Sequence, residues 1–108
     1  MRKEQLAAYL LIFHCGATYA VLSPGLERVF GVKGKELREA VNALRREGVP
    51  ICSNAGGYFY AETEEEIRGT LRHMTNRIAG IAGAIRGLRE SLSRYEAIGS
   101  PTEEGDGF

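Results

Sequence analysis

The sequence predicts a mainly helical α+β protein in which one small β-hairpin lies between short helices and one long C-terminal helix. Apolar residues recur at helical spacing in four segments. Between the third and fourth segments, the run "VPICSNAGGYFYAE" reads as two short strands around a glycine-rich turn. A length of 108 residues suits one compact domain. We therefore expect a domain over residues 1–62, a long helix over 63–96 and a disordered tail over 97–108.

Residues 3–15 are expected to form the first helix, which Gly16 ends. Residues 17–22 follow as a short strand or an extended linker. The apolar residues at helical spacing in this helix are Leu6, Tyr9, Leu10 and Phe13.

Residues 23–30 are expected to form the second helix. Its start is marked by Ser23 as the N-cap and by Pro24 at the first helical position, and Gly31 ends it. Its apolar face consists of Leu26, Val29 and Phe30.

The third expected helix, residues 34–47, follows after only two residues. Lys33 stands at its N-cap position, where Ser or Thr would be expected. A short turn between two helices, of which the second has an apolar stripe and a basic outer face, is typical of a helix-turn-helix. The stripe consists of Leu37, Ala40, Val41 and Leu44.

The hairpin after this helix is expected to act as a wing, meaning a hairpin that lies beside the second helix of the helix-turn-helix. Alternation along a strand places Tyr58 and Tyr60 on one face and Phe59 on the other. We expect Ile51, Tyr58 and Tyr60 to face the core and close it. The turn "NAGG" supplies residues that tolerate positive φ.

This order of elements, together with the segment "ELREAVNALRREGVPICSNAGGYF", resembles the winged helix-turn-helix domain of biotin-operon-repressor type. The resemblance covers about residues 5–62 and implies that the second helix of the motif enters the DNA major groove. The chain has no segment that resembles the biotin-ligase domain, so that activity is not implied. A short winged helix with a helical tail also resembles small phage or mobile-element regulators.

The residues expected to contact DNA lie on the basic face of the third helix and at the wing. Arg and Asn side chains make bidentate contacts with guanine and adenine edges, and Lys pairs with phosphates. For the helix, the alternative is a solvated face without a partner, which the interleaved Glu36, Glu39 and Glu47 favour. For the wing, the alternative is that its residues serve only the conformation of the turn. The candidate residues are Lys33, Lys35, Arg38, Asn42, Arg45, Arg46, Ser53 and Asn54.

The long helix is expected to begin at Thr63, which forms a capping box with Glu66. An unbroken heptad seam then runs over four repeats, which is typical of a coiled coil. We expect Ile67, Leu71 and Met74 to pack on the winged domain and the later seam residues to form an oligomer. Those later residues are Ile78, Ile81, Ile85, Leu88 and Leu92.

The oligomer is expected to be a homodimer, preferably antiparallel, with room for a dimer of dimers. Antiparallel pairing would bring the acidic start of the helix, "TEEE", close to the arginines near its end. Glycines at positions 80, 83 and 87 each cost about 1 kcal/mol in a helix interior. They lie opposite the seam, which alanines flank, so small residues nearly all round the helix imply that other helices approach closely on more than one side.

Composition and motifs argue against several other functions. The two histidines are isolated, the two cysteines are dispersed, and no phosphate-binding glycine pattern occurs, so we expect no enzyme activity, metal or cofactor. Cys15 and Cys52 are interpreted as buried reduced thiols, with a disulfide as the minor alternative. The apolar runs "LAAYLLIF" and "IAGIAGAI" are too short to span a bilayer, so we expect a soluble cytoplasmic protein.

Charge is divided unevenly along the neutral chain. Residues 1–60 carry a net charge of +3 and residues 61–108 a net charge of −3. We expect a sequence-specific protein that binds double-stranded DNA, with an oligomeric transcriptional regulator as the leading interpretation. The alternative is a winged helix that contacts another protein, as an assembly or replication-accessory factor. A purely structural oligomerisation module would leave the basic helix unexplained.

Overall fold

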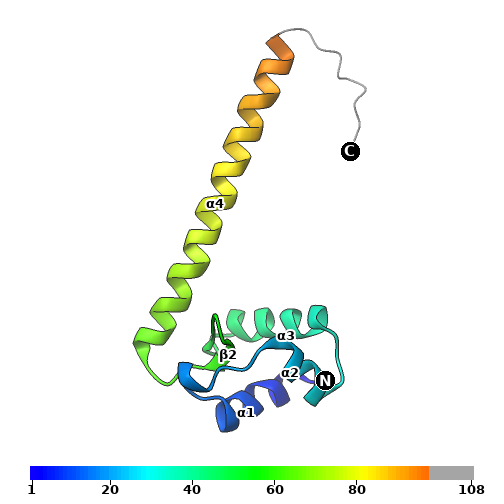
Figure 1. The fold of residues 1–108 in the computed structure, drawn as a ribbon, viewed down its shortest axis with the longest axis vertical. Coiled ribbons are helices and arrows are strands. Elements are labelled where there is room, and N and C mark those ends of the chain that lie inside the picture. Colours follow the sequence, from blue (N-terminus) through cyan, green and yellow to red (C-terminus); the bar gives the residue numbers. More distant parts are fainter. Residues whose placement is uncertain (98–108) are drawn as a thin grey trace. The chain divides into compact units, whose positions relative to one another are not determined.

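The computed structural model describes residues 1–97, so the predicted disordered tail lies outside the described residues from position 98 onward. Three short helices, a hairpin and a long helix follow one another as predicted (Figure 1). The chain divides into two compact units, of which the first is Met1–Arg72 and the second begins at His73. The elements are α1 (Lys3–Phe13), the 3₁₀ turn η1 (Ala17–Tyr19), α2 (Ser23–Phe30), α3 (Gly34–Arg46), β1 (Ile51–Asn54), β2 (Gly57–Tyr60) and α4 (Glu64–Ala97).

The core of the first unit lies where α1, α2 and α3 meet the hairpin (Figure 1). All three helices contribute leucines at the predicted spacing, and these side chains are excluded from water. Full burial of a leucine contributes about 1.5–3 kcal/mol. The buried cluster consists of Leu6, Leu10, Leu26, Leu37, Val41, Leu44 and Ile51.

Two predicted apolar positions lie outside this core. Phe13 is 60% exposed at the end of α1, although its ring lies 4.9 Å from that of Tyr9. Val29 is 52% exposed on α2. In both helices, therefore, some of the apolar residues predicted to lie on the buried face are exposed to solvent.

The start of α2 differs from the prediction by one residue. The helix begins at Ser23 and Leu22 occupies the N-cap, so Ser23 is not the cap. Instead, the Ser23 hydroxyl donates a hydrogen bond of 2.7 Å to the Glu27 carboxylate one turn later. At α3, Lys33 is the N-cap, as predicted, and its side chain makes no capping bond.

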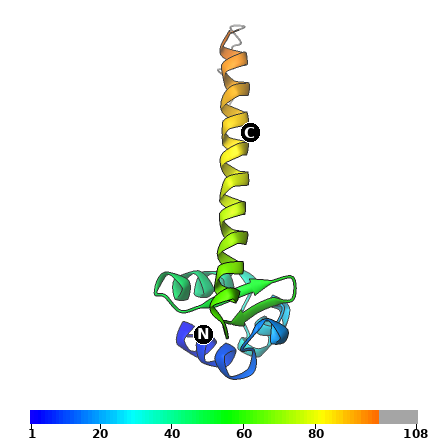
Figure 2. The same cartoon turned by 90° about the vertical axis from the view of Figure 1, so that its left-hand side faces the viewer.

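Both faces of the hairpin are covered, although only one was predicted to be. The two strands of the hairpin run antiparallel (Figure 2). Ile51 pairs with Tyr60 on the core side, as expected, and Cys52 pairs with Phe59 on the other side. Cys52 and Phe59 are each only 2% exposed. The first turns of α4 lie against this second face, since the Cys52 thiol donates to the Glu66 carbonyl oxygen at 3.6 Å.

The segment before α2 also joins the hairpin. Residues 17–22 form the turn η1 and then a single bridge, in which Val21 and Tyr58 exchange two backbone hydrogen bonds of 2.8 and 2.9 Å. Gly57 sits at this contact with a φ of 115°. A side-chain carbon at this position would lie 2.0 Å from the Val21 carbonyl oxygen, so the position requires glycine.

The predicted capping box begins α4. The Glu66 amide donates to the Thr63 hydroxyl at 3.2 Å, and the Thr63 amide donates to the Glu66 carboxylate at 3.3 Å. The same carboxylate accepts the Ala17 amide of η1 at 2.8 Å. The first turn of α4 is therefore fastened to η1.

The expectation that Leu71 packs on the winged domain is wrong, because its side chain is 55% exposed. Thr70 occupies the buried position instead, at 7% exposure. Its hydroxyl accepts the Ser53 amide at 3.2 Å and lies 3.4 Å from the Ser53 carbonyl oxygen. This part of α4 meets the edge of a strand, where a hydroxyl satisfies backbone groups that a leucine could not.

No helix within residues 1–97 is both long enough and apolar enough to cross a membrane.

Candidate nucleic-acid interface

The outer face of α3 gathers four of the candidate residues into one stripe. Because Leu37, Val41 and Leu44 are buried against α1 and the hairpin, the opposite side of the helix faces solvent. Positions 35, 38, 42 and 46 are spaced by three and four residues, which places them on one helix face. We name this stripe the reading face after the role expected from the sequence. Its four exposed side chains are Lys35, Arg38, Asn42 and Arg46.

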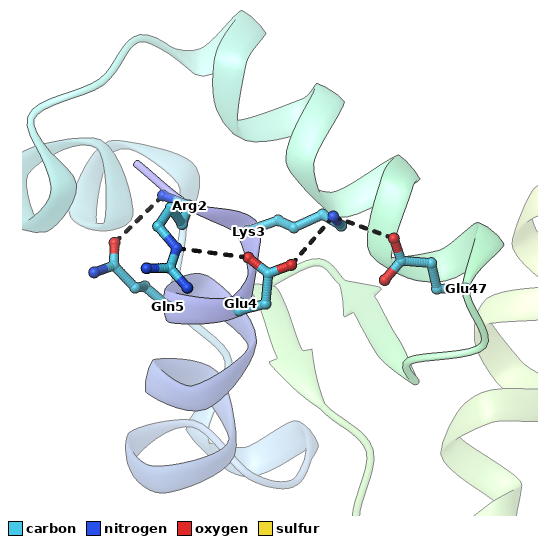
Figure 3. A network of polar contacts seen from close by, with 5 residues as sticks. All are labelled: Arg2, Lys3, Glu4, Gln5 and Glu47. Carbon is cyan, nitrogen blue, oxygen red and sulfur yellow. Dashed lines mark hydrogen bonds and ion pairs between the residues drawn. The ribbon is translucent and has the colours of Figure 1, made fainter.

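Two of the three interleaved glutamates are paired with the start of the chain. The Glu36 carboxylate lies 3.7 Å from the Met1 amino group. The Glu47 carboxylate lies 3.2 Å from Lys3 Nζ, which also contacts Glu4 at 3.2 Å (Figure 3). The hydrogen bond to Glu47 is the largest cause that raises the pKa of Lys3 above 10.5. Of the acidic residues that favoured a solvated helix, Glu39 alone has no ion pair within residues 1–97.

Arg45 and Ser53 have a structural role at the junction of α3 and β1. Arg45 Nε donates to the Ile51 carbonyl oxygen at 2.7 Å, and its Nη2 donates to the Ser53 hydroxyl at 3.3 Å. Ser53 also bonds to Thr70 of α4 through its backbone. These contacts hold the hairpin in a fixed position beside α3, and a DNA contact from either residue stays a prediction.

The two remaining candidates lie at the ends of these elements. Lys33 is exposed immediately before α3. Asn54 is exposed where β1 ends, and its side-chain oxygen accepts the Gly56 amide at 2.7 Å. This bond is the local one by which asparagine stabilises a turn. The side-chain amide nitrogen of Asn54 stays available as a donor.

The second unit presents the predicted oligomerisation seam. Its seam residues are exposed along α4 by amounts that are unusual for large apolar side chains, which suggests self-association. Exposure is 67% for Ile78, 57% for Ile81, 45% for Ile85, 71% for Leu88 and 57% for Leu92.

Two contacts of this region could not be found from sequence patterns. The Arg45 bond to Ile51 joins a helix to a strand, and the Thr70 bond to Ser53 spans 17 positions. Arg45 and Thr70 both fit the ordinary spacing of polar and apolar residues in their helices, so no local feature of the sequence indicates these contacts. Within residues 1–97, no group of three or more His, Cys, Asp or Glu side chains is placed to hold a metal ion. Both cysteines are free thiols.

In comparisons with protein-family models, curated proteins and solved structures, no match to this chain was found.

Proposed function

We propose that this protein binds double-stranded DNA in a sequence-specific manner and acts as an oligomeric transcriptional regulator. The observation that carries the proposal is the α3 reading face, in which Lys35, Arg38, Asn42 and Arg46 are exposed together. An amphipathic helix of 13 residues is about 20 Å long and fits the major groove. No catalytic chemistry is required.

The wing supports the proposal because it is held rigidly beside α3. Hydrogen bonds from Arg45 fix β1 to the end of the helix. A wing fixed in this way can touch the DNA backbone next to the groove that α3 enters, through the exposed turn at Asn54. Lys33, at the start of α3, adds a phosphate contact.

Self-association through α4 would give the regulator two reading heads. The helix has 34 residues and is therefore about 50 Å long. Its exposed isoleucines and leucines would be removed from water in a homodimer or a dimer of dimers. The acidic first turn, Glu64, Glu65 and Glu66, and the basic last turn favour an antiparallel pair.

The decisive experiment is a salt titration of binding to duplex DNA. Neutralisation of phosphates by basic side chains releases counterions, so the logarithm of the affinity falls linearly with the logarithm of the salt concentration. Four or five basic contacts per protomer predict a slope of about −4. Lys35→Ala should make the slope shallower by about 1, whereas Arg68→Ala, on α4, serves as the control.

Absence of DNA binding even at low salt would contradict the proposal. The alternative function, a winged helix that docks on another protein, would then be preferred, because exposed Glu39 lies among the basic residues of α3.

A further inference from the structure

The outermost line of α3 carries one acidic residue, to which DNA binding as proposed above gives no role. Four exposed side chains follow one another along the side of α3 opposite its buried residues, at spacings of four, three and four positions. They are Lys35, Glu39, Asn42 and Arg46. Glu39 therefore lies in the middle of the reading face, with a basic residue before it and another after it.

The fold itself does not explain this glutamate. Glu39 makes no hydrogen bond or ion pair within residues 1–97, whereas Glu36 and Glu47 are paired with the first residues of the chain. Lys35 precedes it by four positions, which is the less favourable order for a Lys–Glu pair on a helix. Glu39 is also the sixth residue of α3, beyond the first turn, in which the helix dipole stabilises a carboxylate. The side chain is thus free for a partner.

A carboxylate that faces DNA is repelled by the phosphates unless a base donates a hydrogen bond to it. In the major groove, the amino groups at cytosine N4 and adenine N6 are the donors. Adenine presents its N7 acceptor beside N6, and that acceptor repels a carboxylate oxygen. Guanine and thymine present acceptors at the corresponding edge. Cytosine is therefore the base whose edge a glutamate side chain fits best.

We propose that Glu39 is a specificity-determining residue, which accepts a hydrogen bond from the N4 amino group of a cytosine in the major groove. This role rests on the proposed DNA binding and narrows the class of sequence that α3 selects. Lys35 and Arg46, at the two ends of the line, contact phosphates and so offset the repulsion of the carboxylate in the groove.

Asn42 sets the place of this cytosine in the sequence. It follows Glu39 by three residues, which is about 4.5 Å along the helix axis. Successive nucleotides of one DNA strand are about 3.4 Å apart. Because Asn matches adenine, and with α3 lying along the groove, the cytosine should be next to an adenine or one position away from it.

The test compares the wild type with Glu39→Gln and Glu39→Ala, all as the full chain. Selection from a library of random duplexes gives the preferred sequence of each protein, and fluorescence anisotropy then measures the affinity for four duplexes that differ at one base pair. We expect the wild type to bind the duplex with cytosine about tenfold more tightly than the other three. A glutamine amide both donates and accepts, so Glu39→Gln should shift the preference at that position to adenine, and Glu39→Ala should remove it.

Glu36→Gln is the matched control. It removes the same charge from the same helix, but the Glu36 carboxylate lies 3.7 Å from the Met1 amino group and is not part of the exposed line. Any gain in affinity from the lost negative charge should be shared by all duplexes, so this variant should keep the preference for cytosine. Neither glutamate belongs to the buried cluster, so circular dichroism should show an unchanged fold in all variants.

An identical selected sequence for the wild type and Glu39→Gln would overturn the role of Glu39 and leave sequence-specific DNA binding intact. A base other than cytosine at the position that responds to Glu39→Gln would overturn it as well, as would a wild type without base preference or the same shift in Glu36→Gln. Failure of the wild type to bind any duplex at low salt would instead overturn the proposed function, and the role of Glu39 with it.

Discussion

At the scale of single residues, Arg38 and Asn42 are the best candidates for reading bases. Both are exposed on α3, one turn apart, and the glutamates at positions 36 and 47 are engaged with the N-terminal residues. An arginine guanidinium can make two hydrogen bonds to the edge of a guanine, and an asparagine amide can make two to the edge of an adenine. Lys35 and Arg46, on the same face, are better suited to phosphates.

We expect Arg38→Ala and Asn42→Ala each to weaken binding to a selected sequence by about 1–3 kcal/mol. The melting temperature should hardly change, since neither side chain belongs to the buried cluster. Fluorescence anisotropy with selected and scrambled duplexes would measure both effects. Wild-type affinity in both variants would show that α3 does not read the sequence.

Gly57 is the residue with the strictest backbone requirement. Its φ is positive, and any side chain would collide with the Val21 carbonyl. We expect Gly57→Ala to destabilise the protein by more than about 1 kcal/mol, because strain and displacement of residues 20–22 add together. Chemical denaturation would test this. Gly56→Ala is the control, since its new methyl group would meet only ordinary or slightly tight contacts at 3.2–3.4 Å.

At the scale of elements, one carboxylate fastens α4 to the turn η1. Glu66 accepts amides from Ala17, Glu62 and Thr63. The bond from the Ala17 amide is the main cause that lowers its pKa below the ordinary value of 4.5. These hydrogen bonds form only in the folded protein, and they stabilise the ionised Glu66 carboxylate over its protonated form.

We expect Glu66→Gln to destabilise the first unit by about 1 kcal/mol at neutral pH, as loss of a helix cap does. A lowered pKa in the folded state means that the stabilisation is present above pH 4.5 and is lost as the pH falls through the folded-state pKa. The difference in melting temperature between wild type and variant should therefore shrink below pH 4.5. Glu65→Gln, which removes an exposed partner of Arg72, is the control and should show little difference at either pH.

At the scale of the whole molecule, the proposed self-association through α4 would decide how many copies of α3 contact DNA together. Ile81 is one of the five seam residues expected to form the oligomer and is 57% exposed. A buried aspartate at this position would leave a charge without a partner in the interface. Two-fold symmetric regulators recognise paired half-sites through both protomers, so loss of the oligomer should also weaken operator binding.

We expect Ile81→Asp to be monomeric at about 10 µM, where the wild type is at least a dimer. Light scattering would measure the mass. In the variant, binding to a duplex with two half-sites should weaken, whereas binding to a duplex with one half-site should not change. Thr75→Asp, at an exposed polar position of α4, is the control. A monomeric wild type at the same concentration would contradict the role given to α4.

The order of elements could be predicted from the sequence because each element carries a local signal. Helical spacing of apolar residues, Gly31 after α2 and the Thr63–Glu66 capping box depend on neighbours a few positions away. The α3 reading face follows from the same periodicity, because burial of Leu37, Val41 and Leu44 determines which residues stay outside.

Only the tertiary structure decided how these elements are joined. Burial of Cys52 and Phe59, the Thr70 bond to Ser53 and the engagement of Arg45 with β1 depend on residues that are distant in sequence or belong to different elements. Their partners are selected by packing, which no local pattern records. The sequence by itself thus determined the helices, the hairpin and the basic face. The three-dimensional packing decided which polar residues of that face and wing are used to hold the fold and which are left for a partner.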